Sequence, residues 1–205
     1  MVLALGALFA AHGIPALLGP LSSNLPNWTV RAASLVGLIG SAAMLIGLMQ
    51  FARARVAGRR HPALALAFGA WAAEFVARLA PLNGELSEPQ VWSALQLVAS
   101  SAAMWLAASG VAWILRAQQA AGAIGPWRRA RRAFGALTFA TCALVALSAA
   151  LGPESELWQR VQTAPLGPAL AWIAFAAPWL LLALAVRASV RWLGRVRSTA
   201  EILAR

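Results

Sequence analysis

The sequence predicts an all-α membrane protein, a polytopic transmembrane helical bundle with six spans. Of its 205 residues, 61% are hydrophobic and only 11% are charged, and the mean hydropathy of +0.71 lies far above that of a soluble domain. Apolar runs long enough to cross a bilayer recur along the whole chain. The segments between them alternate between arginine-rich and acidic. We therefore expect a single integral membrane domain over residues 1–205.

Each predicted span is an apolar run close to the 17 to 25 residues that a crossing needs. The first run has no basic segment before it and is too long for the core of a signal peptide, so we interpret it as a helix. The single Cys142 lies in the fifth run, where we expect a buried small side chain. The six runs are 2–20, 30–52, 62–81, 90–115, 132–151 and 165–187.

Arginine distribution predicts the orientation of these spans. All 17 basic residues are Arg, and 14 of them lie after the second, fourth and sixth spans, whereas the other loops hold four Glu. Because short arginine-rich loops stay in the cytoplasm, we expect both termini to be cytoplasmic (N-in/C-in). Residues 188–205 then form a basic cytoplasmic tail. Arg187, Arg191 and Arg195 recur at i, i+4 and i+8, which predicts that the last helix continues into the interface.

Tryptophan side chains fall at two kinds of depth in this scheme. Trp113, Trp127 and Trp192 lie near the inner boundary, where an indole can place its ring among acyl chains and its N–H among head groups. Trp71, Trp105, Trp172 and Trp179 lie deeper. We therefore expect the first group to anchor the bundle at the membrane surface and the second to pack in its core.

The spans carry signs of internal repetition. The tetrapeptide Ser-Ala-Ala-Met begins at Ser41 in the second span and at Ser101 in the fourth, and Gly-Ala pairs begin at Gly6, Gly69 and Gly135 in the odd spans. The spacings of these matches are 60, 63 and 66 residues. They predict three parallel two-helix repeats, although alanine-rich helices also match by chance.

The formal net charge of +11 would suggest nucleic acid as a partner if the chain were soluble. Here the arginines flank apolar spans, so we expect membrane lipids, including anionic head groups, as partners and no nucleic acid. Glycine, alanine and serine on the second and fourth spans permit close helix contact. A homo- or hetero-oligomer in the membrane is one use of such faces, and packing within the chain is the other.

Composition excludes several chemistries. The chain has no Lys, Asp or Tyr, so a Schiff base and metal sites built from clustered Asp lack their residues. Two His and one Cys cannot form a tetrahedral zinc site without Glu. His12 and His61 lie at different depths, which argues against bis-His haem ligation. We therefore assign no catalytic residues, no metal and no cofactor, and favour a role other than that of an enzyme.

Three ionisable residues form a midplane polar set. From the cytoplasmic ends of their spans, His12 lies about 15 Å deep and Glu74 about 18 Å deep in a core about 30 Å thick. Arg78 lies one turn beyond Glu74, at the i+4 spacing that favours an ion pair on one helix face. One interpretation is a buried clamp between helices. The other is a proton relay, in which Glu74 finds a different partner such as His12, Gln96 or Thr141.

These observations lead to two hypotheses. The first is a non-catalytic multi-pass protein of the bacterial inner membrane, either transporting a small solute, coupled to protons through His12 and Glu74, or serving as a membrane subunit of a larger complex. The alternative is an integral membrane enzyme or carrier that acts on a lipid or isoprenoid at the cytoplasmic interface. In that case Arg59, Arg60 and His61 would bind its phosphate head group.

Overall fold

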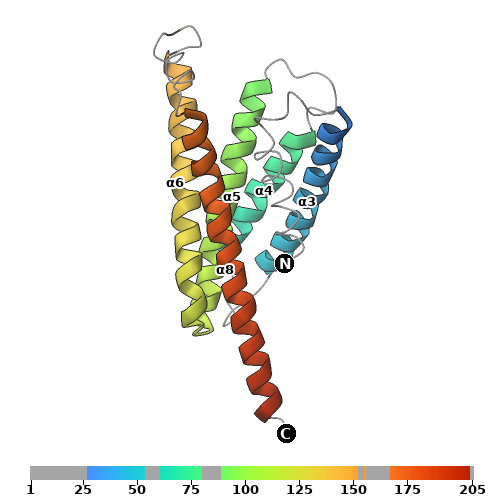
Figure 1. Ribbon diagram of the computed structural model, residues 1–205, viewed down its shortest axis with the longest axis vertical. Coiled ribbons are helices and arrows are strands. Elements are labelled where there is room, and N and C mark those ends of the chain that lie inside the picture. The colour runs from blue at the N-terminus through green and yellow to red at the C-terminus, as the bar shows by residue number, and fades with distance from the viewer. Residues whose placement is uncertain (1–26, 54–60, 80–88, 152–154, 156–166, 204–205) are drawn as a thin grey trace.

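The computed structural model confirms the all-α class (Figure 1). It describes residues 27–53, 61–79, 89–151, 155 and 167–203. Within this part of the chain there are five helices, each close to a predicted span but longer at one end or both, except for α4. They are α3 (Asn27–Arg53), α4 (Pro62–Leu79), α5 (Pro89–Ala117), α6 (Ala121–Leu151) and α8 (Gly167–Leu203).

Three of these helices are long and apolar enough to cross a membrane. Their candidate spans are Leu95–Ala117 in α5, Ala121–Leu151 in α6 and Ala176–Ser198 in α8. Two shorter apolar segments, Leu38–Gln50 in α3 and Pro62–Val76 in α4, occupy the second and third predicted spans. The predicted span 2–20 lies outside the described residues. The chain is thus a candidate multi-pass membrane protein, and the total of six spans stays a prediction.

The helices form an up-and-down bundle in which each packs chiefly against its neighbours in the chain. Figure 1 shows α5 in the middle, α3 and α4 on one side and α6 and α8 on the other. The end of α3, the start of α4 and the α5–α6 connection lie towards the same end of the bundle (Figure 1). The C-terminal part of α8 projects beyond that end. It continues the helix to Leu203, as the spacing of the tail arginines predicts.

Small side chains fill the interior of this bundle, and large apolar ones cover its outside. Among the residues that the structure describes, ten of the 21 buried apolar ones are alanines, whereas sixteen large hydrophobic side chains are exposed. Ile39 on α3 and Phe139 on α6, for example, are 66% and 67% exposed. A soluble protein buries such residues. In a bilayer the lipid solvates them, and alanine inside lets the helix backbones approach.

The closest approach involves Gly110 of α5, which faces α4. A Cβ atom at this position would overlap Cγ and Cδ2 of Leu64, a residue that is itself 1% exposed. Gly135 of α6 plays a similar part towards α5, since a Cβ there would lie 3.3 Å from Nε1 of Trp105. Because these two glycines carry no side chain, α4, α5 and α6 can pack closely.

The connection between α5 and α6 is much shorter than the sequence predicts. Gln119 has a φ of 55°, and the N–H groups of Ala120 and Gln119 donate to the carbonyls of Leu115 and Arg116 at 2.9 and 3.0 Å. This is a Schellman motif, which usually places glycine at the left-handed position. Helix α6 begins at Ala121, before the predicted span 132–151, so Arg128, Arg129 and Arg131, which the sequence places between two spans, are helical.

Two side-chain expectations are also wrong. Cys142 is exposed rather than buried, because it lies on a face of α6 that turns away from the other helices. Trp127 is only 3% exposed and donates its indole N–H to Ser189 Oγ at 2.7 Å. It therefore ties α6 to α8 instead of anchoring in head groups. Trp71 and Trp179 are buried at 0% and 6% exposure, as predicted.

Candidate functional site

Glu74 projects into the interface between α3 and α4 from one face of α4. Helix α4 begins at Pro62, whose fixed φ and missing N–H suit a first helical position. Ala67, Trp71 and Glu74 follow at helical spacing, and all three are 0% exposed. The apolar periodicity that buries Ala67 and Trp71 thus carries the Glu74 carboxyl inward with them.

A serine on the facing helix contacts this carboxyl. Ser41 Oγ of α3 donates a hydrogen bond to Glu74 Oε2 at 3.3 Å, and Ser41 is also 0% exposed. The indole N–H of Trp71 donates to the Ser41 carbonyl oxygen at 3.0 Å. Two residues of α4 therefore meet one residue of α3. We call Ser41, Trp71 and Glu74 the α3–α4 polar site.

The α3–α4 polar site lies deep in the bundle. Helices α3 and α4 are antiparallel, and about 18 Å of helix separates Ser41 from Arg53 and Glu74 from Pro62. Both residues therefore lie at the same level of the bundle. The position of Glu74 near the middle of the membrane stays a prediction.

A second polar contact joins α5 and α6 at the next hairpin. Thr138 Oγ1 donates to Ser101 Oγ at 3.1 Å, and both residues are buried. Ser101 begins the second copy of Ser-Ala-Ala-Met, and Ser41 begins the first. Each serine thus bonds to the helix that follows its own, and the methionine of each copy, Met44 or Met104, is buried. This equivalence agrees with the predicted repeats, which remain a prediction for the chain as a whole.

Of the predicted midplane set, Glu74 is the residue whose side chain the structure describes. His12 lies outside the described residues. Arg78 belongs to α4, and its side chain is likewise outside the described part of the chain. Thr141, one of the partners considered for Glu74, donates within its own helix to Leu137 O at 2.8 Å. Sequence reasoning missed Ser41 as a partner, although the repeated tetrapeptide marked its position.

His61 performs a structural task at the start of α4. Its Nδ1 accepts the backbone N–H of Ala63 at 3.2 Å, and its carbonyl oxygen accepts that of Leu64 at 3.1 Å. This is N-terminal capping, in which a residue before the helix satisfies donors of the first turn. The ring also packs against Trp113, with centroids 5.1 Å apart. Arg59 and Arg60, predicted to act with His61 on a head group, lie outside the described residues.

The chemistry available at the α3–α4 polar site is that of a single carboxyl group beside a hydroxyl and an indole. Such a group can take up and release a proton, and Ser41 can reorient its hydroxyl to follow either state. Among the described residues no three His, Cys, Asp or Glu side chains come together as a metal site would require. The geometry therefore directs attention to proton exchange at Glu74.

Comparison with known proteins adds no relative from which a role could be transferred. No protein-family model matches the chain, and neither a curated protein nor a solved structure matches it. The function of the chain is therefore inferred from the geometry of the site. That geometry belongs to an all-α chain with three candidate membrane spans.

Proposed function

We propose that this chain is a non-catalytic, multi-pass protein of the bacterial inner membrane that transports a small solute, with proton exchange at Glu74 as the coupled step. His12 is proposed to act as the second group of the relay. The observation that carries the proposal is the fully buried Glu74 carboxyl, hydrogen-bonded to Ser41 of the facing helix. In the other form of this proposal, the chain serves as a membrane subunit of a larger complex.

The cost of burial supports a functional reason for Glu74. Ionisable residues within membrane spans are expensive, and those that persist commonly line proton or substrate paths. A purely structural link between α3 and α4 needs no carboxyl group, because α5 and α6 are joined by two hydroxyls at Ser101 and Thr138. Of these two hairpin contacts, the first contains an ionisable side chain, Glu74, and the second contains two hydroxyl groups.

The alternative of a lipid-processing enzyme or carrier receives less support at its predicted site. His61 already accepts the Ala63 N–H and packs against Trp113. A role for its Nδ1 in head-group binding would break the cap of α4. We also propose that the chain contacts membrane lipids, that it forms an oligomer in the membrane, and that it does not bind nucleic acid.

Proton flux into proteoliposomes tests the proposal. The full chain is reconstituted with an internal pH-sensitive dye, and a potassium gradient with valinomycin drives protons inward. We expect flux above that of protein-free liposomes for the wild type and none for Glu74→Gln. The amide keeps the shape of the carboxyl group and still accepts from Ser41, so the variant should remain monodisperse in detergent with an unchanged helical circular dichroism spectrum.

The two repeated serines provide a matched control. Both are buried in Ser-Ala-Ala-Met, but only Ser41 contacts Glu74. Ser41→Ala should alter the pH dependence of the flux, whereas Ser101→Ala should leave it unchanged. Wild-type flux in a folded Glu74→Gln variant would dismiss the relay. If the wild type itself does not exceed empty liposomes, the transport form is refuted and the membrane-subunit form remains, for which co-purification from native membranes is the measurement.

A further inference from the structure

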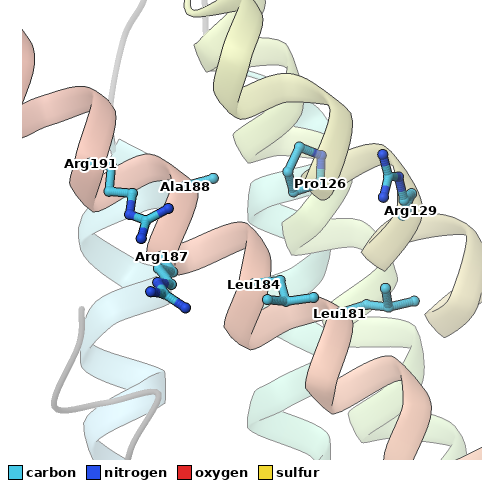
Figure 2. A pocket seen from close by; sticks show the side chains of 7 residues that line it. All are labelled: Pro126, Arg129, Leu181, Leu184, Arg187, Ala188 and Arg191. Atoms are coloured by element: carbon cyan, nitrogen blue, oxygen red, sulfur yellow. The ribbon is translucent and has the colours of Figure 1, made fainter.

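An open cavity of about 260 Å³ lies between α6 and α8, away from the α3–α4 polar site. Pro126 and Arg129 line it from α6, and Leu181, Leu184, Arg187 and Arg191 line it from α8 (Figure 2). We call it the α6–α8 groove. Three guanidinium groups and no carboxylate are among its lining side chains. The groove therefore has the charge of an anion-binding site.

The lining changes character along α8. Leu181 and Leu184 lie at one end of the groove and Arg187 and Arg191 at the other, as Figure 2 shows. About 15 Å of helix separates Leu181 from Arg191. The apolar end belongs to the part of α8 nearer the membrane interior, and the basic end leads towards the projecting C-terminal segment. An occupant that matches this gradient has an anionic head and an apolar tail.

A buried hydrogen-bonded contact joins α6 and α8 beside the groove. Trp127, next to Pro126, donates to Ser189 Oγ at 2.7 Å, and Ser189 donates to the Ala185 carbonyl oxygen at 3.1 Å. Trp127 and Ser189 are buried at 3% and 5% exposure. Their bond fixes the spacing of α6 and α8 beside the groove. Arg129 lies on the α6 wall towards Leu181, and Arg187 and Arg191 lie at the other end of the groove (Figure 2).

The size of the groove limits what it can hold. At about 30 Å³ for each water molecule, 260 Å³ accommodates about nine such groups, which is close to a glycerophosphate. Drug-sized ligands need pockets of about 300–1,000 Å³. Arginine binds phosphate oxygens through paired, charge-assisted hydrogen bonds. Arg187 and Arg191, one turn apart on α8 with no carboxylate in the groove lining, also repel each other, and one phosphate relieves that repulsion.

We propose that the α6–α8 groove is a binding site for an anionic phospholipid. Its phosphate contacts Arg187 and Arg191, and its acyl chains lie along Leu181 and Leu184. This goes beyond the general attraction of basic loops to an anionic membrane surface, because the groove selects one lipid at one place. It is independent of proton exchange at Glu74, and either proposal can fail without the other.

Lipid titration of the full chain in detergent, followed by native mass spectrometry, tests the site. We expect dioleoylphosphatidylglycerol to bind the wild type more tightly than dioleoylphosphatidylcholine. Arg187→Gln/Arg191→Gln should weaken phosphatidylglycerol binding by about tenfold or more, since removing one charge-assisted hydrogen bond to phosphate changes affinity by a factor of this order.

A double variant with the same reduction in charge is the matched control. Arg128 and Arg132 are exposed on α6 and do not line the groove, so Arg128→Gln/Arg132→Gln should keep the wild-type affinity within about twofold. Equal weakening in both double variants would show diffuse surface attraction and overturn the site. Equal affinity of the wild type for the two lipids would also overturn it.

Two further experiments complete the test. Inorganic phosphate at millimolar concentration should not displace phosphatidylglycerol, because the apolar end of the groove holds the acyl chains. Displacement would assign the groove to soluble phosphate and refute the lipid. If Arg187→Gln/Arg191→Gln is not monodisperse, Arg191→Gln alone decides, with weakening of about tenfold expected and unchanged affinity contradicting the proposal.

Discussion

Replacing Gly110 by alanine tests the closest helix contact in the bundle. The added Cβ would overlap Cγ and Cδ2 of Leu64, which is itself 1% exposed. Cγ is the branch point of the leucine side chain, so a change of its terminal methyl groups alone does not remove the overlap. Either α4 and α5 separate or Leu64 adopts a strained rotamer.

The magnitude follows from comparison with a glycine that faces outward. A Cβ at Gly69 of α4 meets nothing within 4 Å, so Gly69→Ala should gain up to about 1 kcal/mol from helix propensity. Gly110→Ala has the same propensity gain but also an overpacking cost of about 1–3 kcal/mol. The difference between the two variants, about 1–3 kcal/mol, measures the steric overlap. For a chain of this length it corresponds to roughly 2–12 °C in melting temperature.

Thermal unfolding in detergent, followed by size-exclusion chromatography after heating, is the assay. Leu64→Ala alone should cost about 2–5 kcal/mol through the cavity it leaves. In the double variant Gly110→Ala/Leu64→Ala, the new methyl group fills part of that cavity, so the destabilisation should be smaller than the sum of the two single effects. If Gly110→Ala melts like Gly69→Ala, or the two effects are strictly additive, α4 and α5 do not meet at this position.

Two further predictions concern α6 and the turn before it. Gln119→Gly should stabilise the chain by about 0.5–1 kcal/mol, because glycine adopts the left-handed conformation at φ 55° without the Cβ penalty; an unfolding midpoint below that of the wild type would contradict the Schellman motif. Cys142 is exposed on α6 and lies about 15 Å beyond Arg132 along the helix, so in intact membranes a charged maleimide should not label it whereas an apolar maleimide should. Cys142→Ala/Ser198→Cys, with the thiol on the exposed distal part of α8, should react with both reagents, and labelling of Cys142 by the charged reagent would contradict burial in lipid.

Part of the candidate site could be predicted from the sequence. Glu74 is an acidic residue within an apolar run, and its depth follows from counting residues along a helix. Its contact with Ser41 could not be derived in the same way, because 33 residues separate the two and the rotation of α3 against α4 decides the pairing. The repeated tetrapeptide was the one sign, since both copies place a serine towards the next helix.

The wrong expectations share one physical cause. In a soluble helix the apolar side is the buried side, but in a bilayer both sides are apolar and hydropathy no longer tells them apart. Cys142 therefore looked like a core residue and is exposed, and Trp127 looked like a surface anchor and is buried against Ser189.

By itself the sequence determined the helical class and the approximate place of each described helix along the chain, and its composition made the chain a candidate membrane protein. These properties depend on local composition summed along the chain, and hydrogen bonding within each helix satisfies the backbone wherever lipid replaces water. Only the tertiary structure decided which side chains meet: Ser41 with Glu74, Gly110 with Leu64, and three arginines around one groove. Such pairings depend on how far helices rotate and how closely they approach, and these are set by the packing of small residues from separate parts of the chain.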